Sequence, residues 1–169
     1  IMISKYAYEN IKLPNKTVWI PQQHINWDRE KGKKKGKVAG YIGAPSARAR
    51  RYYEVIGEEV KKVGWEWITC FDYQTREDCV NFYKSIDLLV VGSLHRYEPL
   101  NTPTKLINAP SFGVPSIPYP LPGYLEWEGN YTHMDFNNLT EQIKSMKRSN
   151  IDTEEYHISN IAKRYENTI

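Results

Sequence analysis

Short apolar runs alternate with longer segments of helical periodicity through the middle of this 169-residue chain. The apolar runs occupy 37–42, 65–71, 87–91 and 114–117, and a turn follows each of them. Such alternation is typical of α/β folds, in which helices connect the strands of a parallel sheet. We therefore predict an α/β domain with a Rossmann-like parallel sheet and helices on both of its faces.

Residues that favour helix termini support this assignment. Ser46 is a suitable N-cap for the first connecting helix, and Thr75 with Asp78 resembles a capping box. Pro103 suits the first position of a short helix capped by Thr102. The remaining predicted elements are a helix at 4–11, a strand at 17–20, and helices at 138–148 and 153–165.

The net charge of +3 depends on one lysine run, and without its five lysines the chain is slightly acidic. A nucleic-acid binder spreads basic residues over a face, so we expect no nucleic-acid partner. The run is expected to be a hydrated linker; the functional alternative is peripheral contact with anionic lipid headgroups. Its members are Lys31, Lys33, Lys34, Lys35 and Lys37.

The chain shows no sign of crossing or entering a membrane. No apolar stretch approaches the roughly 20 residues of a membrane-spanning helix. No secretory signal peptide is recognisable either, so we expect a cytoplasmic location, with the lipid contact as its peripheral variant.

The loops after the predicted strands carry basic and hydroxyl residues beside helix starts. Open α/β sheets bind ligands at the carboxyl ends of their strands, and a helix N-terminus attracts phosphate. Lys105 falls in the first turn of the helix expected near Thr102, where a cation is unfavourable unless an anion binds. This placement predicts a phosphate site. The alternative is that Lys105 runs along the surface and bonds a backbone carbonyl.

A second basic group, Arg48, Arg50 and Arg51, follows the turn "GYIGAPS". We expect one of these side chains to reach a diphosphate; the alternative is a solvated helix face. The turn lacks G-x-G-x-x-G, which disfavours an NAD-binding enzyme. It is also basic where a flavodoxin-like signalling receiver needs an acidic cluster.

The segment "TPTKLINAPSFGVPSI", Thr102 to Ile117, followed by "PGYLE", resembles the donor-site signature of GT-B glycosyltransferases. In that family a helix reads K-L-x-E-A-x-x-x-G-x-P-x-I, and a later G-x-x-E closes the site. "NFYKSIDLLVVGS" is similar to another family segment, and "SKYAYENI…VWIPQQHIN" to the one that crosses between the two domains. The resemblance implies the Rossmann-like C-terminal half, which binds a nucleotide sugar.

The resemblance also implies a domain organisation. We expect 1–36 to be an interdomain segment with a basic linker, 37–150 to be the donor-binding domain, and 151–169 to be a C-terminal helix. The sequence holds no counterpart of the acceptor-binding domain, so the chain would supply one wall of the site. The implied partners are a nucleotide sugar and an acceptor-binding domain or subunit. One strand, where the family has two, is expected before "NFYKSID".

Residue roles follow from the same resemblance. It implies retaining, metal-independent transfer, in which N–H groups and basic side chains stabilise the leaving diphosphate, with no cofactor beyond the sugar donor. Asn108 stands where the family's usual Glu holds the ribose. Phe71 or Tyr73 would face the base, and the alternative for Phe71 is a place in the core. Glu98 and Glu126 are candidates near the sugar, and the alternative for each is a solvated side chain. The implied catalytic residues are Lys105 and Arg48, and the implied donor-binding residues are Gly43, Arg51, Tyr73, Thr102, Thr104, Asn108 and Glu126.

Two function classes stay open at this point. The first is donor binding for glycosyl transfer by half of a two-domain enzyme. The second is a non-catalytic module that holds a phosphorylated ligand or a protein partner. The missing acceptor domain favours the second class, and so does Asn108, which brings no charge to a ribose.

Overall fold

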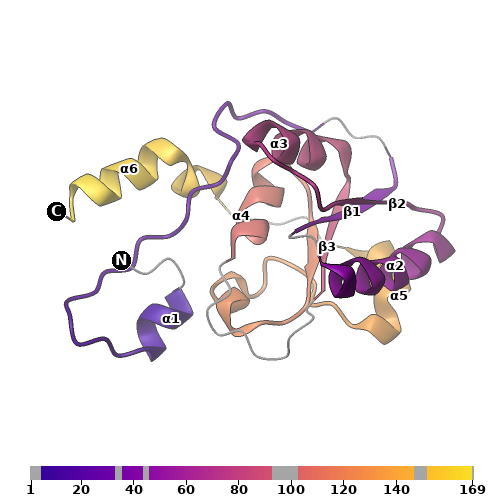
Figure 1. Cartoon of the computed structure of the whole chain (residues 1–169), viewed down its shortest axis with the longest axis horizontal. Helices are drawn as coiled ribbons and strands as arrows, with labels where there is room; N and C mark the ends of the chain where they lie inside the picture. Colours follow the sequence, from indigo (N-terminus) through magenta and orange to yellow (C-terminus); the bar gives the residue numbers. More distant parts are fainter. Residues whose placement is uncertain (1–4, 33–35, 44–45, 93–102, 147–151, 169) are drawn as a thin grey trace.

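A four-stranded parallel sheet forms the centre of the molecule (Figure 1). The computed structural model describes residues 5–32, 36–43, 46–92, 103–146 and 152–168. The strand order is β2-β1-β3-β4, and every neighbouring pair is parallel. The predicted α/β class and Rossmann-like parallel sheet are therefore confirmed.

The strands lie close to their predicted positions. β1 and β3 are buried along their whole length, as expected for central strands covered on both faces, whereas the edge strand β2 exposes Glu66 and Thr69. The last strand begins two residues later than predicted. The reason is that Gly113, with a φ of 76°, and Val114, whose N–H donates to Ala109 O, still belong to the turn after α4. The strands are β1 (Val38–Ile42), β2 (Glu66–Cys70), β3 (Leu88–Val91) and β4 (Ser116–Pro118).

Helices connect the strands and cover both faces of the sheet. In Figure 1, α3 and α4 lie on one face, and α2 and α5, which contact each other, lie on the other. The chain steps from β1 out to β2 and then back across to β3, so right-handed crossovers place α2 and α3 on opposite faces. The described residues between α2 and α3 form one strand, as expected. The helices are α2 (Ala47–Lys62), α3 (Arg76–Ser85), α4 (Thr104–Ser111) and α5 (Leu139–Ser145).

Two of the predicted helix caps are formed. Ser46 accepts a hydrogen bond of 3.0 Å from a backbone amide in the first turn of α2. Thr75 and Asp78 form a complete capping box at the start of α3. The start of α4 differs from the prediction, because Pro103 occupies the N-cap position and its carbonyl accepts the first helical hydrogen bonds. Thr102, the predicted cap, lies outside the described residues.

The segments before β1 and after α5 contain short helices. The predicted helix at 153–165 is interrupted, because His157 accepts a hydrogen bond from Ser159 N and so caps a new helix. The predicted strand at 17–20 is wrong: Trp19 makes an isolated bridge, and the following proline has no N–H for a ladder. The helices are α1 (Lys5–Asn10), η1 (Pro122–Trp127), η2 (Phe136–Asn138), η3 (Thr153–Tyr156) and α6 (Ile158–Glu166), where η marks a 3₁₀ helix.

A second buried cluster lies beside the main core of the sheet. It joins α4 and η1 to η3, and we call it the second core. Its position means that the C-terminal segment covers apolar residues of α4. The second core consists of Leu106, Ile107, Leu121, Tyr124, Trp127 and Tyr156.

Two features bear on the expected location. Lys31 is exposed, while Lys33, Lys34 and Lys35 lie outside the described residues, so the lipid contact stays a prediction. Of the helices that the structure describes, none has both the length and the apolar composition needed to cross a bilayer.

Candidate functional site

The carboxyl edge of the sheet has a topological switch point between β1 and β3. These strands are neighbours in the sheet, but the chain leaves β1 for α2 on one face and leaves β3 for α4 on the other. Crevices at such points are where open α/β sheets bind their ligands. Residues 44–45 and 93–102, which follow the two strands, lie outside the described residues. The described groups on either side of these segments define the candidate site.

Two stacked tyrosines join the ends of β1 and β3. The rings of Tyr41 and Tyr53 lie 3.4 Å apart between centres and 14° from parallel. The Tyr53 hydroxyl donates a hydrogen bond of 2.9 Å to the carbonyl of Gly92, directly after β3. Burial raises the pKa of both phenols, so both stay neutral at ordinary pH. The pair is thus a neutral aromatic support at the switch point.

Glycines are required beside this support because the aromatic rings leave no room for a side chain. A Cβ on Gly43 would lie 2.1 Å from the Tyr41 hydroxyl, and a Cβ on Gly92 would lie 2.3 Å from the Tyr52 ring. The Gly43 amide donates to Cys70 O at 3.1 Å. Gly43, a predicted donor-binding residue, therefore lies at the predicted edge of the sheet, where it fits the Tyr41 ring.

Lys105 reaches the same aromatic support from the other face of the sheet. It is half-buried in the first turn of α4, and its Nζ atom lies 5.6 Å from the centre of the Tyr41 ring. A cation at this distance from an aromatic face is weakly attracted to it. The structure thus places the Lys105 ammonium beside the end of β1, close to the switch point.

The three arginines lie in the first two turns of α2, which begins directly after the loop that follows β1. Arg48 and Arg51 are exposed. Arg50 forms an ion pair of 2.8 Å with Asp72 and lies 4.9 Å from the centre of the Phe71 ring. Phe71 itself is buried, as its alternative core assignment predicted.

The remaining predicted residues are less completely placed. Tyr73 has 39% of its surface exposed, and it lies close enough to Tyr41 to affect the pKa of that phenol. Thr102 and Glu98 lie outside the described residues, and so does the side chain of Glu126 in η1. Tyr73 is therefore an exposed aromatic side chain beside the candidate site.

Thr104 and Asn108 are engaged with the N-terminal segment. The Thr104 hydroxyl donates to Gln22 Oε1 at 2.5 Å. Asn108 is 5% exposed, and its Oδ1 atom accepts a hydrogen bond of 3.0 Å from the amide of Ile25. A buried amide oxygen that pairs with a backbone N–H holds that segment in place. These two side chains attach residues 22–25 to α4.

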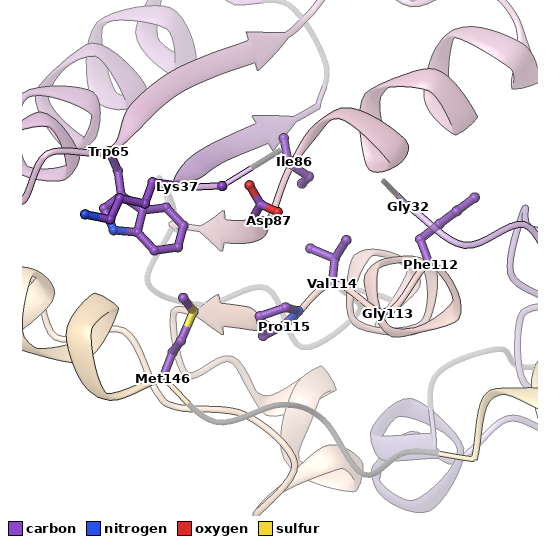
Figure 2. A pocket seen from close by; sticks show the side chains of 11 residues that line it. Gly32, Lys37, Trp65, Ile86, Asp87, Phe112, Gly113, Val114, Pro115 and Met146 are labelled. Atoms are coloured by element: carbon purple, nitrogen blue, oxygen red, sulfur yellow. The ribbon is translucent and has the colours of Figure 1, made fainter. Parts of the chain in front are cut away.

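A cavity of about 290 Å³ lies at the opposite, amino-terminal edge of the sheet (Figure 2). Lys37, Trp65, Asp87 and Pro115, which directly precede the four strands, all line it. Helices of a parallel sheet end at this edge, and their negative dipole ends, together with the Asp87 carboxylate, disfavour phosphate there. We therefore keep the carboxyl edge as the candidate site for an anionic ligand.

The structure also shows two features that the sequence analysis missed. The stacking of Tyr41 on Tyr53 joins a strand to a helix, and its local sequence signal is Gly43, which leaves room for the Tyr41 ring. The buried pair His24 and His157 has no local sequence signal, because the two residues lie far apart in the chain.

Neither a metal site among the described residues nor a comparison with known proteins adds to the definition of the candidate site. Among the described residues, no group of three or more His, Cys, Asp or Glu side chains is arranged to hold a metal ion. No protein-family model matches this chain, and no curated protein matches it either. The candidate site is therefore defined by its own geometry, an aromatic support and a lysine at the switch point of a parallel sheet.

Proposed function

We propose that this chain binds a nucleoside-diphosphate sugar at the carboxyl edge of its sheet, as the donor-binding half of a GT-B glycosyltransferase. The transfer would be retaining and independent of metal. The observation that carries the proposal is the position of Lys105, in the first turn of α4 and 5.6 Å from the Tyr41 ring centre, next to the switch point. The partners would be a nucleotide sugar and an acceptor-binding domain or subunit.

The chemistry needed at such a site is stabilisation of the diphosphate that leaves. Its negative charge grows as the bond to the sugar breaks, and positive groups held in place beforehand stabilise it. Lys105 and the N-terminus of α4 supply positive potential from one side of the edge. Arg48 and Arg51, near the N-terminus of the 16-residue helix α2, supply it from the other.

The contacts in the structure refine the implied roles. Asn108 and Thr104 hold the N-terminal segment, so we assign them to the architecture of the site and not to the ribose. We assign Gly43 to the packing of the Tyr41 ring, because a Cβ there would lie 2.1 Å from the Tyr41 hydroxyl and its N–H is already bonded to Cys70 O. Tyr73 is exposed and aromatic, so we assign it to the nucleobase.

A second candidate is a non-catalytic module that binds a phosphorylated ligand. The bond from the Ile25 amide to Asn108 favours it, because it occupies the side chain that the family resemblance would use for ribose. Such a module would use Lys105 in the same way but would require neither the sugar nor an acceptor.

A thermal-shift screen with UDP-, GDP-, ADP- and dTDP-sugars, in the presence of EDTA, tests the proposal. A ligand at 100 times its dissociation constant stabilises the folded state by about 2.7 kcal/mol. The proposal expects stabilisation by at least one nucleotide sugar and none by the free sugar. An equal shift with inorganic pyrophosphate alone would favour the second candidate, and no shift with any of these compounds would overturn both.

A further inference from the structure

Two buried histidines join the two ends of the described chain. His24 is 2% exposed and His157 is 5% exposed, and their ring centres lie 5.5 Å apart at 67°. The backbone amide of His24 donates to Tyr156 O at 2.9 Å. The pair therefore lies where the N-terminal segment meets the junction of η3 and α6.

The hydrogen bonds of His157 join α6 to the N-terminal segment. Its Nε2 atom lies 2.9 Å from the carbonyl oxygen of Trp27, which can only accept, so Nε2 carries the proton. Its Nδ1 atom accepts a hydrogen bond of 3.3 Å from Ser159 N, and it lies 2.8 Å from Ser159 Oγ. In this form the side chain caps α6 and attaches it to the N-terminal segment.

His24 lies in surroundings that oppose a positive charge. Its Nδ1 atom is buried and has no hydrogen-bond partner among the described residues. Burial lowers the pKa of His24, and the nearby His157 lowers it further, while the Thr153 backbone and the Glu154 carboxylate act in the opposite direction. Glu154 is half-exposed and forms an ion pair of 3.0 Å with Arg29, which weakens its effect.

We infer that the His24–His157 pair is a pH-sensitive clamp, which holds residues 152–168 on the N-terminal segment when both rings are neutral and releases them when the pair takes up a proton. A proton on Nδ1 of His157 would replace the acceptor that caps α6 with a donor facing Ser159 N–H. It would also place a cation at the positive end of a helix. A proton on His24 would bury a charge beside its neighbour.

The direction of the pH effect follows from linkage. The pKa of His24 is lower in the closed state than its ordinary value of 6.5, so the released state binds the proton more tightly. The clamp is intact above pH 6.5 and weakens as the pH falls through the lower pKa of the closed state.

Release would uncover part of the second core. Tyr156 packs on Trp127 with ring centres 4.8 Å apart, and both belong to the cluster that contains Leu106 and Ile107 of α4. The clamp therefore controls access to an apolar surface on α4 and η1. This inference does not depend on the proposed nucleotide-sugar site, which lies at the carboxyl edge of the sheet.

Amide hydrogen exchange of the full chain, measured by NMR between about pH 7.5 and about pH 5, tests the clamp. Protection factors, corrected for intrinsic exchange, should fall in α6 about tenfold for each pKa unit that separates the closed and released states, while β1 and β3 stay protected. Wild-type protection in α6 that does not change with pH would overturn the inference.

Variants separate the clamp from other titrating groups. The double variant His24→Gln with His157→Asn keeps a capping side chain but removes both titrating rings, and it should lose the pH dependence. His133→Gln is the matched control, because His133 pairs with Glu128 outside the clamp, and it should behave like wild type. If the double variant stays open at all pH values, the NMR chemical shifts of the histidine ring nitrogens in wild type provide the test. Ring protonation at a different pH from the loss of α6 protection would overturn the clamp.

Discussion

Lys105 comes from a helix on one face of the sheet and Tyr41 from the central strand β1, and the Lys105 Nζ atom lies 5.6 Å from the centre of the Tyr41 ring. Tyr41 stacks on Tyr53 of α2, whereas Lys105 belongs to α4 on the other face. A cation–π contact contributes about 0.5–1 kcal/mol at an exposed site and about 2 kcal/mol when it is desolvated, which is comparable with the roughly 1.5–3 kcal/mol of a charge-assisted hydrogen bond. The contact therefore holds the ammonium beside the end of β1, where the proposed diphosphate would compete with the ring for it.

Replacing Gly43 with alanine should destabilise the fold by about 1–3 kcal/mol, as overpacking of a tight site does. The new Cβ would lie 2.1 Å from the Tyr41 hydroxyl, so the Tyr41–Tyr53 stack would have to shift. Urea unfolding of Gly43→Ala in the wild-type and Tyr41→Ala backgrounds measures this coupling. Equal costs in both backgrounds would contradict the assigned contact.

Asn108→Ala should cost about 1–3 kcal/mol of unfolding free energy, because it leaves the Ile25 amide without its partner. Hydrogen exchange at Ile25 should accelerate, and nucleotide affinity should stay unchanged. Asn10→Ala is the control, because the Asn10 side chain bonds Tyr6 O at an exposed position and should matter little. Lost nucleotide affinity at unchanged stability would return Asn108 to the ribose.

Asp78 should make stability depend on pH in the acid range. The backbone amides of Gln74 and Thr75 donate to its carboxylate and hold its pKa below the ordinary 3.8. The contribution of the Asp78 carboxylate to the stability of the folded state is therefore present above pH 3.8, and it is lost as the pH falls through the lower folded-state pKa. Unfolding midpoints of Asp78→Ala and wild type should converge in acid. Glu77→Ala, from the same turn, is the control; a difference independent of pH would refute the assignment.

The chain by itself should not transfer sugar to an acceptor. In the proposed two-domain site, an acceptor must be positioned against the donor, and positioning supplies much of the rate. We expect slow donor hydrolysis at most, measured as release of nucleoside diphosphate with and without candidate acceptors. Robust transfer to a defined acceptor by this chain alone would disprove the half-site account.

Local sequence signals were sufficient for the sheet and most helix starts. Ser46 and the Thr75–Asp78 pair cap helices as predicted, because capping depends on residues three positions apart. The prediction of a strand at 17–20 is wrong because an apolar run forms a strand only when it pairs with the edge of a sheet. The local sequence does not reveal whether such an edge lies beside it. Such pairing is decided by tertiary structure.

The candidate site was predictable only in part. Lys105 was singled out from its position at a helix start, and the structure places it beside the switch point. The resemblance implies that Asn108 faces a ribose, and the structure shows that its Oδ1 atom accepts from the amide of Ile25, 83 residues away in sequence. No periodic pattern encodes so distant a contact, and the His24–His157 pair was missed for the same reason.

Isothermal titration calorimetry with UDP and GDP tests the central claim most directly. Wild type should bind at least one of them, Lys105→Ala should weaken binding by about 1.5–3 kcal/mol, and added salt should weaken it further. Lys62→Ala is the matched control and should bind like wild type. Lys62 is the last residue of α2, at the opposite end of that helix from Arg48 and Arg51, and it pairs with Glu59. Equal affinity in wild type and Lys105→Ala, or no binding by either, would contradict the donor site and leave only the fold.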